Sequence, residues 1–315
     1  MKLSKNQILF LEPIFKELIW GGDKLLTKFG YEIPSENTGE CWAIAAHKNG
    51  DCKVISEEFD GYTLSRLWNE HRELFGNLDG DVFPLLIKIL DARKDLSIQV
   101  HPDDIYAKEC ENGSLGKTEC WYVLDCEEDT TIIIGHNAKD SEELERMVRE
   151  NRWPKLLREV KIHKGDFFQI IPGCIHAIKG GTMILETQQN SDITYRLYDY
   201  DRLSADGKPR ELHTEKALDV IKAPFVPCTP ERTVQTFAGY NREKLVECEY
   251  YCVEKLTITS YAEILQEYNF MNVSVIEGSG TVDGIPIKKG THFILPHNYG
   301  TAILKGEMEL IISYL

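Results

Sequence analysis

Short apolar runs rich in Val, Ile, Phe, Tyr and Thr recur along the whole chain, and Gly, Pro, Asn and Asp separate them. Runs of this kind are typical of β-strands joined by turns. The pattern therefore predicts a mainly β protein. The clearest predicted strands are CWAIAAH (41–47), CKVIS (52–56), FPLLIKIL (83–90), CWYVLD (120–125), TTIIIG (130–135), FFQII (167–171), TMILETQ (182–188), ITYRLY (193–198), KLTITSY (255–261) and the final MELIISYL.

Two segments show helical periodicity instead. Segment 63–76 repeats apolar side chains three and four residues apart, begins at a candidate cap, Thr63 or Ser65, and ends at Gly76. Segment 140–153 begins with an Asp-Ser pair and carries acids in its first turn. We expect both to be helical insertions in a β framework.

A weak internal repeat predicts two related β-sandwiches. The stretches KGDFFQIIP (164–172) and KGTHFILP (289–296) are each a Lys-Gly turn that leads into an apolar strand ending at Pro. The proline-marked segment 222–233 lies between them and is the candidate domain boundary. We therefore expect a larger domain over 1–230 and a smaller β domain over 231–315.

Composition and charge exclude several classes of partner. The chain has 315 residues, of which 42% are hydrophobic and 28% charged, and no run approaches the roughly 20 apolar residues of a membrane helix. The net charge of −15 repels nucleic acid and anionic membranes. Nine cysteines without a Cys-x-x-Cys pair, and a start that does not resemble a secretory signal, favour a reducing, cytoplasmic location.

Polar residues interrupt several strands where apolar ones would be ordinary. In SIQVH, strand alternation places Ser97, Gln99 and His101 on one face. Glu119 stands at the start of an apolar strand, and His176 follows a Pro-Gly turn within another. Buried polar groups need partners. Each of these residues alone could be a hydrogen-bonded core or edge residue, but their coincidence favours a site.

Together the glutamine, the glutamate and the two histidines form a metal-ligand set. Two imidazoles and one carboxylate are typical of a catalytic zinc site that keeps a position open for water or substrate. The same set would also suit iron. The amide oxygen of Gln99, as a neutral fourth donor, favours zinc, with one ion per chain.

Several longer motifs of the chain resemble those of a known family, the type I phosphomannose isomerases (mannose-6-phosphate isomerases) in their short bacterial form. These are zinc enzymes of the cupin superfamily. The resemblance runs over nearly the whole chain and implies two cupin-like jelly-roll sandwiches. It rests on LEPIFKELIWGG, GECWAIAAH, PLLIKILDARKDLSIQVHP, GKTECWYVL and ETQQNSDITYRLYDYDR.

The resemblance assigns roles to individual residues. It implies zinc ligation by Gln99, His101, Glu119 and His176 and a catalytic role for Arg196. It also implies that Ser97, Lys88 and Lys117 bind the substrate. Lys117 would have a catalytic role as well.

Two short motifs depart from the family pattern. Lys-Thr-Glu-Cys (117–120) stands where the family often has Lys-Pro-Glu-Met, and Ile-Pro-Gly (171–173) stands where it often has Pro-Ala-Gly. The expected ligands stay in place, while the local turn geometry is left open.

The implied reaction interconverts mannose 6-phosphate and fructose 6-phosphate by moving a proton through an enediol(ate). Arg196 would stabilise the oxyanion or guide ring opening, or else form a structural ion pair with Asp192 or Asp199. Lys88 would bind phosphate or sugar hydroxyls, or else protect an edge strand. Glu186, in an apolar strand, would be the general base or would orient a metal ligand.

Two other functions stay open at the level of sequence. An iron-dependent cupin dioxygenase would use the same histidines and carboxylate, and a sugar-phosphate-binding cupin would need no chemistry. His292, in the second sandwich, is not accompanied by a second histidine and a glutamate in a similar pattern, so we expect that domain to be metal-free. The expected partner is a small sugar phosphate, and the chain is expected to be a monomer.

Overall fold

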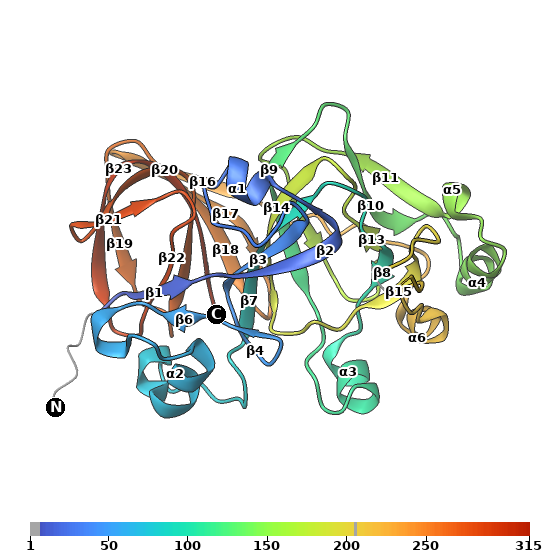
Figure 1. The fold of residues 1–315 in the computed structure, drawn as a ribbon, viewed down its shortest axis with the longest axis horizontal. Helices are drawn as coiled ribbons and strands as arrows, with labels where there is room; N and C mark the ends of the chain where they lie inside the picture. The colour runs from blue at the N-terminus through green and yellow to red at the C-terminus, as the bar shows by residue number, and fades with distance from the viewer. Residues whose placement is uncertain (1–6, 205–206) are drawn as a thin grey trace.

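The computed structural model describes residues 7–204 and 207–315, and the first six residues, where no secretory signal was expected, lie outside that range. The chain forms two β-rich halves side by side, with short helices at the periphery (Figure 1). The prediction of a mainly β fold with short helical insertions is confirmed. Within the described residues, no helix is long and apolar enough to span a bilayer.

The first half is built on a six-stranded antiparallel sheet. Its two central strands are buried on both faces, which explains their nearly continuous apolar sequences. In spatial order the strands are β12 (Phe167–Ile170), β9 (Glu119–Cys126), β14 (Thr182–Gln189), β7 (Leu85–Ala92), β2 (Ile14–Gly22) and β3 (Thr38–Ile44).

A five-stranded sheet faces this one. Its strands are β11 (Leu157–Lys161), β10 (Thr131–His136), β13 (His176–Ala177), β8 (Ile98–Val100) and β15 (Tyr195–Tyr198). Trp121 and Ile184 of the first sheet share one apolar core with Ile132 and Ile134 of the second, so the two sheets form a sandwich. The functional residues described below lie between these sheets.

Helices cover the outer face of the five-stranded sheet. Leu144, Met147 and Trp153 join Ile98 and Tyr195 in a second apolar core on that side. The helices of the first half are α1 (Lys24–Thr27), α3 (Asp104–Cys110), α4 (Ser141–Arg149), α5 (Trp153–Leu156) and α6 (Thr214–Val220).

The helix ends lie at the capping residues and the glycine that the sequence predicts. The hydroxyl of Thr63 accepts from the Arg66 amide at the start of α2 (Leu64–Glu70). A 3-10 turn, η2 (Arg72–Phe75), follows and ends at Gly76, whose φ of 67° is left-handed. Predicted segment 63–76 is thus two short helices. The Asp140 side chain likewise caps α4, and a further 3-10 turn, η1, spans Glu57–Phe59.

The second half is a ten-stranded sheet that curls around its own apolar core. Along its main path it contains β16 (Thr233–Phe237), β17 (Tyr240–Glu247), β18 (Cys252–Ile258), β23 (Gly300–Tyr314), β20 (Met271–Val282), β22 (His292–Leu295), β1 (Leu9–Glu12) and β6 (Lys53–Val54), while β19 (Tyr261–Gln266) and β21 (Ile285–Lys288) pair beside it. A separate two-stranded ribbon joins β4 (Ala46–His47) to β5 (Gly50–Asp51).

Strands from both ends of the chain meet in this second sheet. β1 pairs with β22 and with β6, so the N-terminal segment completes the C-terminal sheet. The domain division at 230/231 stays a prediction, although β16 begins at Thr233, just beyond it. A shared core in which Phe75 and Phe83 contact Phe270 holds the two halves together.

Candidate active site and metal centre

The site begins with a row of polar residues across the five-stranded sheet. His176 on β13 lies opposite Gln99 on β8, and Gln99 lies opposite Arg196 on β15. Residues directly opposite one another in paired strands project from the same face. These three residues, distant in sequence, therefore line one side of the sandwich interior.

A second row crosses the six-stranded sheet. Glu186 on β14 lies opposite Lys88 on β7 and opposite Trp121 on β9, and Glu119 lies two residues before Trp121 on the same face. The site therefore consists of one row on each sheet. His101 completes it from the turn after β8.

Turn geometry fixes the two histidines relative to each other. The Gly173 amide donates to the carbonyl of His101 at 3.0 Å, and Gly173 has a left-handed φ of 85°. The Ile-Pro-Gly motif, which departs from the family pattern, therefore forms a tight turn that ties the loop before His176 to His101.

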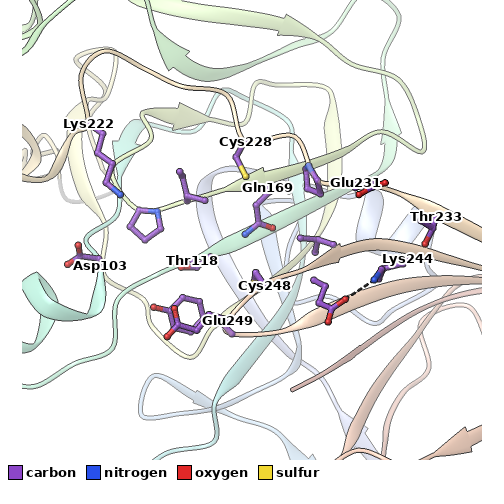
Figure 2. Close-up of a pocket in the computed structure, with 16 residues that line it drawn as sticks. Asp103, Thr118, Gln169, Lys222, Cys228, Glu231, Thr233, Lys244, Cys248 and Glu249 are labelled. Atoms are coloured by element: carbon purple, nitrogen blue, oxygen red, sulfur yellow. Dashed lines mark hydrogen bonds and ion pairs between the residues drawn. The ribbon is translucent and has the colours of Figure 1, made fainter.

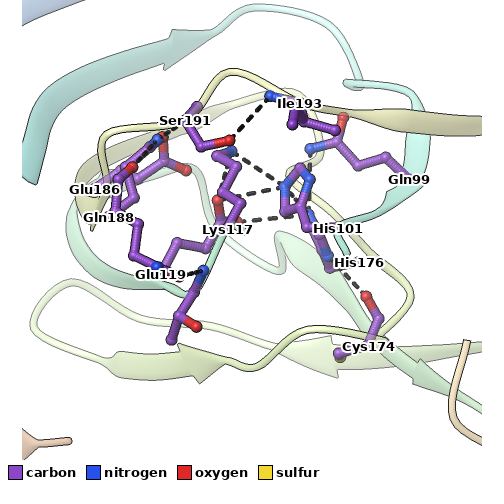
Figure 3. A network of polar contacts seen from close by, with 12 residues as sticks. Gln99, His101, Lys117, Glu119, Cys174, His176, Glu186, Gln188, Ser191 and Ile193 are labelled. Atoms are coloured by element: carbon purple, nitrogen blue, oxygen red, sulfur yellow. Dashed lines mark hydrogen bonds and ion pairs between the residues drawn. The ribbon is translucent and has the colours of Figure 1, made fainter. Parts of the chain in front are cut away.

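His101, Glu119 and His176 converge in the interior. The Nε2 atoms of the two histidines are 3.1 Å apart, and the Glu119 carboxylate oxygens lie 3.4 Å from His101 Nε2 and 3.5 Å from His176 Nε2. All three residues are buried, and Figure 3 shows them pointing toward one another. In the described part of the chain, this is the one cluster of His, Cys, Asp or Glu side chains with metal-ligand spacing.

Hydrogen bonds identify the protonation of both rings. His176 Nδ1 lies 2.9 Å from the carbonyl of Cys174, which can only accept, so Nδ1 carries the proton and Nε2 has a lone pair. His101 Nε2 lies 3.1 Å from the Lys117 ammonium, which can only donate, so it also presents a lone pair. Two lone pairs and a carboxylate thus face a common point, an arrangement that a cation stabilises.

The pKa values agree with this assignment. Burial and the Lys117 ammonium lower the pKa of His101 to about 3, and burial lowers the pKa of His176. Burial alone would raise the pKa of Glu119, but Lys117 and His101 hold it well below its usual range. Both rings are therefore neutral and the carboxylate is ionised, which are the forms that bind metals.

Lys117 supplies the positive charge that meets Glu119 in this structure. Its Nζ is 2.6 Å from Glu119 Oε2, and both groups are almost fully buried. Beyond this ion pair, neither oxygen of Glu119 has a hydrogen-bond donor, and His101 Nδ1 has no partner either. Such buried, incompletely satisfied atoms are costly unless a further ligand meets them.

Gln99 contacts the cluster through its amide nitrogen. Gln99 Nε2 lies 3.2 Å from His176 Nε2, while its Oε1 accepts from the Ser97 hydroxyl at 3.4 Å. The structure therefore brings Gln99 to the expected metal site with the amide oxygen turned away. A half-turn of the amide exchanges the two atoms, and the Ser97 hydroxyl can serve either as donor or as acceptor.

Glu186 and Lys88 lie beside the cluster and face each other. Glu186 Oε1 accepts from the Trp121 indole at 3.0 Å, and Oε2 lies 3.6 Å from Lys88 Nζ. Burial, reinforced by the charge of Glu119, raises the pKa of Glu186. The side chain of Lys88 is 7% exposed, so Lys88 is an internal cation rather than the edge-strand lysine of the alternative interpretation.

Arg196 has no carboxylate partner among residues 7–204 and 207–315. The guanidinium donates to the carbonyl of Glu211 at 3.2 Å, and its Nε is buried without a partner. Asp199 is bound instead by Arg202 and Arg210, and Asp192 lies beside His47. The structural ion pairs considered for Arg196 are therefore not formed.

These side chains surround a cavity of about 170 Å³. Lys88, Ser97, Gln99, Lys117, Glu186 and Arg196 all line it, so the predicted substrate residues and part of each strand row open onto one space.

Several other residues that line the same cavity are not marked by any sequence pattern. Arg210 reaches it from a loop with no strand pattern, while Glu40 and Trp42 come from β3. The Trp42 indole donates to Glu40 Oε2 at 2.5 Å, and Lys88 lies 5.1 Å from the centre of the Trp42 ring. The alternation of GECWAIAAH could have indicated that Glu40 and Trp42 share a face, but not that this face meets Lys88.

Comparisons with known proteins agree on one family. The family model described as phosphomannose isomerase type I, catalytic domain, matches residues 8–135, and that of the mannose-6-phosphate isomerase cupin domain matches residues 241–315. Mannose-6-phosphate isomerase ManA of Bacillus subtilis is 51% identical over 98% of both chains. Mannose-6-phosphate isomerase of Streptococcus mutans is 44% identical over 97% of this chain and 98% of its own.

Solved structures show the same architecture. The crystal structure of a mannose 6-phosphate isomerase from Bacillus subtilis has a TM-score of 0.97 and 49% identity, covering 98% of this chain and all of that one. A putative mannosephosphate isomerase from Archaeoglobus fulgidus has a TM-score of 0.77 at 21% identity over 100% and 99% of the two chains, which shows the shared fold alone.

Proposed function

The chain belongs to the type I phosphomannose isomerases, and from that membership and the site we propose that it interconverts mannose 6-phosphate and fructose 6-phosphate with the help of one zinc ion. It is an aldose–ketose isomerase. The observation that carries the metal proposal is the meeting of two imidazole lone pairs, 3.1 Å apart, with an ionised carboxylate in a buried space.

The spacing of the donor atoms fits zinc. Ligand atoms about 2.1 Å from one tetrahedral ion lie roughly 3.4 Å from one another. The oxygens of Glu119 lie 3.4 and 3.5 Å from the nearest nitrogens of His101 and His176. We propose these three as ligands. Gln99 is the proposed fourth, through its amide oxygen after the half-turn described above.

Metal binding and the Lys117 ammonium compete for the same carboxylate. Lys117 Nζ contacts both Glu119 and His101, so a bound cation would push it toward the cavity that it also lines. We propose that Lys117 then holds a sugar hydroxyl or carries a proton. Its pKa is raised by Glu119 against the lowering effect of burial, so it is positively charged near neutral pH.

The reaction moves a proton between C1 and C2 of the open-chain sugar and passes through an enediol(ate). A bound zinc ion would supply a Lewis acid that favours negative charge on the sugar oxygens. Arg196 offers a fixed, permanently charged guanidinium whose Nε lacks a partner, so it is suited to stabilise that developing charge. We assign Arg196 to this contact.

Glu186 is the proposed general base. Its raised pKa makes it a better proton acceptor than an ordinary surface carboxylate, and its second oxygen faces Lys88 on the cavity wall. The alternative is that Glu186 only orients its neighbours through Trp121 and Lys88. Its position on the cavity rather than in contact with a histidine favours the base.

Substrate binding is proposed for Lys88, Ser97 and Lys117. The protein carries a net charge of −15, so an anionic sugar phosphate needs local cations, and the cavity supplies Lys88, Arg196 and Arg210. Ser97 can offer its hydroxyl to a sugar oxygen once Gln99 turns.

The proposal also covers the cellular location of the protein and its oligomeric state. All nine cysteines are free thiols, which suits a reducing compartment, and we propose a cytoplasmic enzyme. No membrane or nucleic-acid partner is proposed, and the monomeric state stays a prediction.

A coupled assay tests the reaction. Purified chain should form fructose 6-phosphate from mannose 6-phosphate without consuming oxygen. The names of the relatives do not favour an iron-dependent dioxygenase or a non-catalytic sugar-phosphate binder. Oxygen consumption by iron-loaded protein would support the first of these, and tight binding of the sugar phosphate without turnover would support the second.

A further inference from the structure

A second, larger cavity lies on the other side of strand β9. Its volume is about 650 Å³, within the usual range of small-molecule sites. The cavity lined by Lys117 and Gln99, next to the proposed metal ligands, has a volume of about 170 Å³. The proline-marked segment 222–233 and β17 of the second half line it together with the end of β12 (Figure 2). It therefore lies where the two halves of the molecule meet.

Thr118 separates the two cavities. It stands between Lys117 and Glu119 in sequence, and it lines the larger cavity while Lys117 lines the smaller one. The Thr118 amide donates to Gln189 Oε1 at 2.8 Å, which fixes the backbone there. A molecule in the larger cavity would thus contact a residue adjacent to two proposed site residues.

The hydroxyl of Thr118 is an unpartnered polar group at the wall of the larger cavity. The residue is 4% exposed, lines the cavity wall, and its Oγ1 has no hydrogen-bond partner. A buried hydroxyl without a partner is unfavourable. A ligand with one donor or acceptor would satisfy it.

The charges around the cavity are unbalanced. Asp103, Glu231 and Glu249 have no ion-pair partner in the described ranges, 7–204 and 207–315, and Lys222 has none either. Lys244 and Glu247 neutralise each other at 2.7 Å. Three unpaired carboxylates against one unpaired ammonium leave an excess of two negative charges, which repels a second sugar phosphate and attracts a cation.

Apolar groups line the same space. Ile171, Pro172, Pro230 and Val246 form part of the wall, and the Tyr250 ring lies among them with its hydroxyl donated to Asp104 at 2.7 Å. We propose that the cavity is a second ligand site, for a small monocation with an apolar or aromatic body whose charged end meets the acidic rim. The proposal does not depend on the isomerase reaction.

Two probes of opposite charge test the site. 2-Phenylethylamine carries a cation on a phenyl body, and 3-phenylpropionate carries an anion on the same body. Isothermal titration calorimetry on the full-length chain should detect binding of the amine and at least about five-fold weaker binding of the anion, as expected for a partly exposed ion pair. Equal binding of the two probes, or no binding of the amine, overturns the proposal.

Variants locate the bound amine. The double substitution Glu231→Gln/Glu249→Gln removes exposed charges and should weaken the amine by roughly five-fold. The matched control is Glu32→Gln/Glu36→Gln, which changes the net charge equally at exposed positions that do not line the cavity, and should leave amine affinity unchanged. An equal loss in both double variants would mean non-specific attraction and overturn the proposal.

The cavity cysteine provides an independent block. Cys228 is exposed and lines the cavity, and Figure 2 shows it on the proline-marked segment 222–233. In a Cys110→Ser background, which removes the other exposed thiol, N-ethylmaleimide on Cys228 should abolish amine binding and leave mannose 6-phosphate turnover intact. Unaltered amine binding in the labelled protein would place the probe elsewhere and overturn the proposal. Thr118→Val, checked for folding by thermal unfolding, should weaken the amine while keeping the shape of the wall.

Discussion

Two buried histidine environments, one in each half of the molecule, have opposite chemistry. His176 in the first half faces the lone pair of His101 at 3.1 Å and the Glu119 carboxylate at 3.5 Å. His292 in the second half is equally buried, but its Nδ1 meets the Ser274 hydroxyl at 2.9 Å and its Nε2 meets the Tyr31 hydroxyl at 2.6 Å.

The difference lies in the partners rather than in burial. Burial lowers the pKa of both His292 and His101, with the Lys117 ammonium adding to the effect at His101, and each pKa falls to about 3. Hydroxyl groups can donate or accept, so they satisfy a neutral imidazole completely. Around His176 the acceptors outnumber the donors instead: Lys117 and the Gln99 amide meet the two lone pairs, and beyond Lys117 the Glu119 oxygens have no hydrogen-bond donor. Unsatisfied acceptors around a buried histidine therefore indicate a metal site better than the histidine itself does.

The largest expected effect follows from removing the carboxylate of the first environment. Glu119→Gln should lose bound zinc and lower kcat/KM by roughly a thousand-fold or more, because the variant lacks the charge that we propose as a metal ligand. Metal content by mass spectrometry and the coupled assay measure both. Glu254→Gln is the matched control: Glu254 is buried and paired with Arg242 in the second half, so its loss should reduce stability and leave zinc in place. A Glu119 variant with full zinc and full rate would contradict the ligand assignment.

Glu186→Gln should retain zinc while kcat falls by about 10²- to 10⁴-fold, the range for loss of a general base. The pKa of Glu186 is raised, and a base works deprotonated, so the wild-type rate should fall as pH drops through that pKa. The pH profile of the variant should lack this acid limb. If Glu186 instead only orients its neighbours, zinc affinity should fall by about 10- to 100-fold and the acid limb should persist.

Arg196→Ala should retain zinc while kcat falls by about 10²- to 10³-fold, since the contact acts on developing charge. Arg196→Lys restores the charge without the planar fork and should recover part of kcat with little change in KM. Steady-state kinetics of the two variants separate these effects. Loss of metal from Arg196→Ala would assign the residue a structural role.

The smallest effect is expected in the second environment. His292→Leu should leave zinc content and kcat unchanged and lower the free energy of unfolding by about 1–3 kcal/mol, because the hydroxyls of Tyr31 and Ser274 lose their buried partner. Urea unfolding measures the change. A simultaneous loss of zinc would mean that the two environments are coupled and would weaken the comparison.

Local sequence patterns were sufficient for much of the fold. Apolar alternation identified the strands that carry Gln99 and Glu119, and capping chemistry located the helix that begins after Thr63. These signals depend on neighbours within a few residues. The N-terminal strand β1 was missed because its partner, β22, lies at the other end of the chain.

The site could be predicted only in part from the sequence, because it too depends on contacts between residues that are far apart along the chain. Gln99, His101 and Glu119 stand out as polar residues in apolar strands, and the structure brings them together with His176. The direct contact of Lys117 with both Glu119 and His101, and the inward reach of Arg210 from a loop, depend on how two sheets face each other. No spacing along the chain encodes that distance.

The most direct measurement is a zinc titration of metal-depleted protein, followed by the rate of mannose 6-phosphate isomerisation. We predict negligible activity after chelation, a linear rise with added zinc and a plateau at one ion per chain, with no such rise in Glu119→Gln. Full activity in the metal-depleted protein, or a plateau unrelated to one ion per chain, would contradict this prediction.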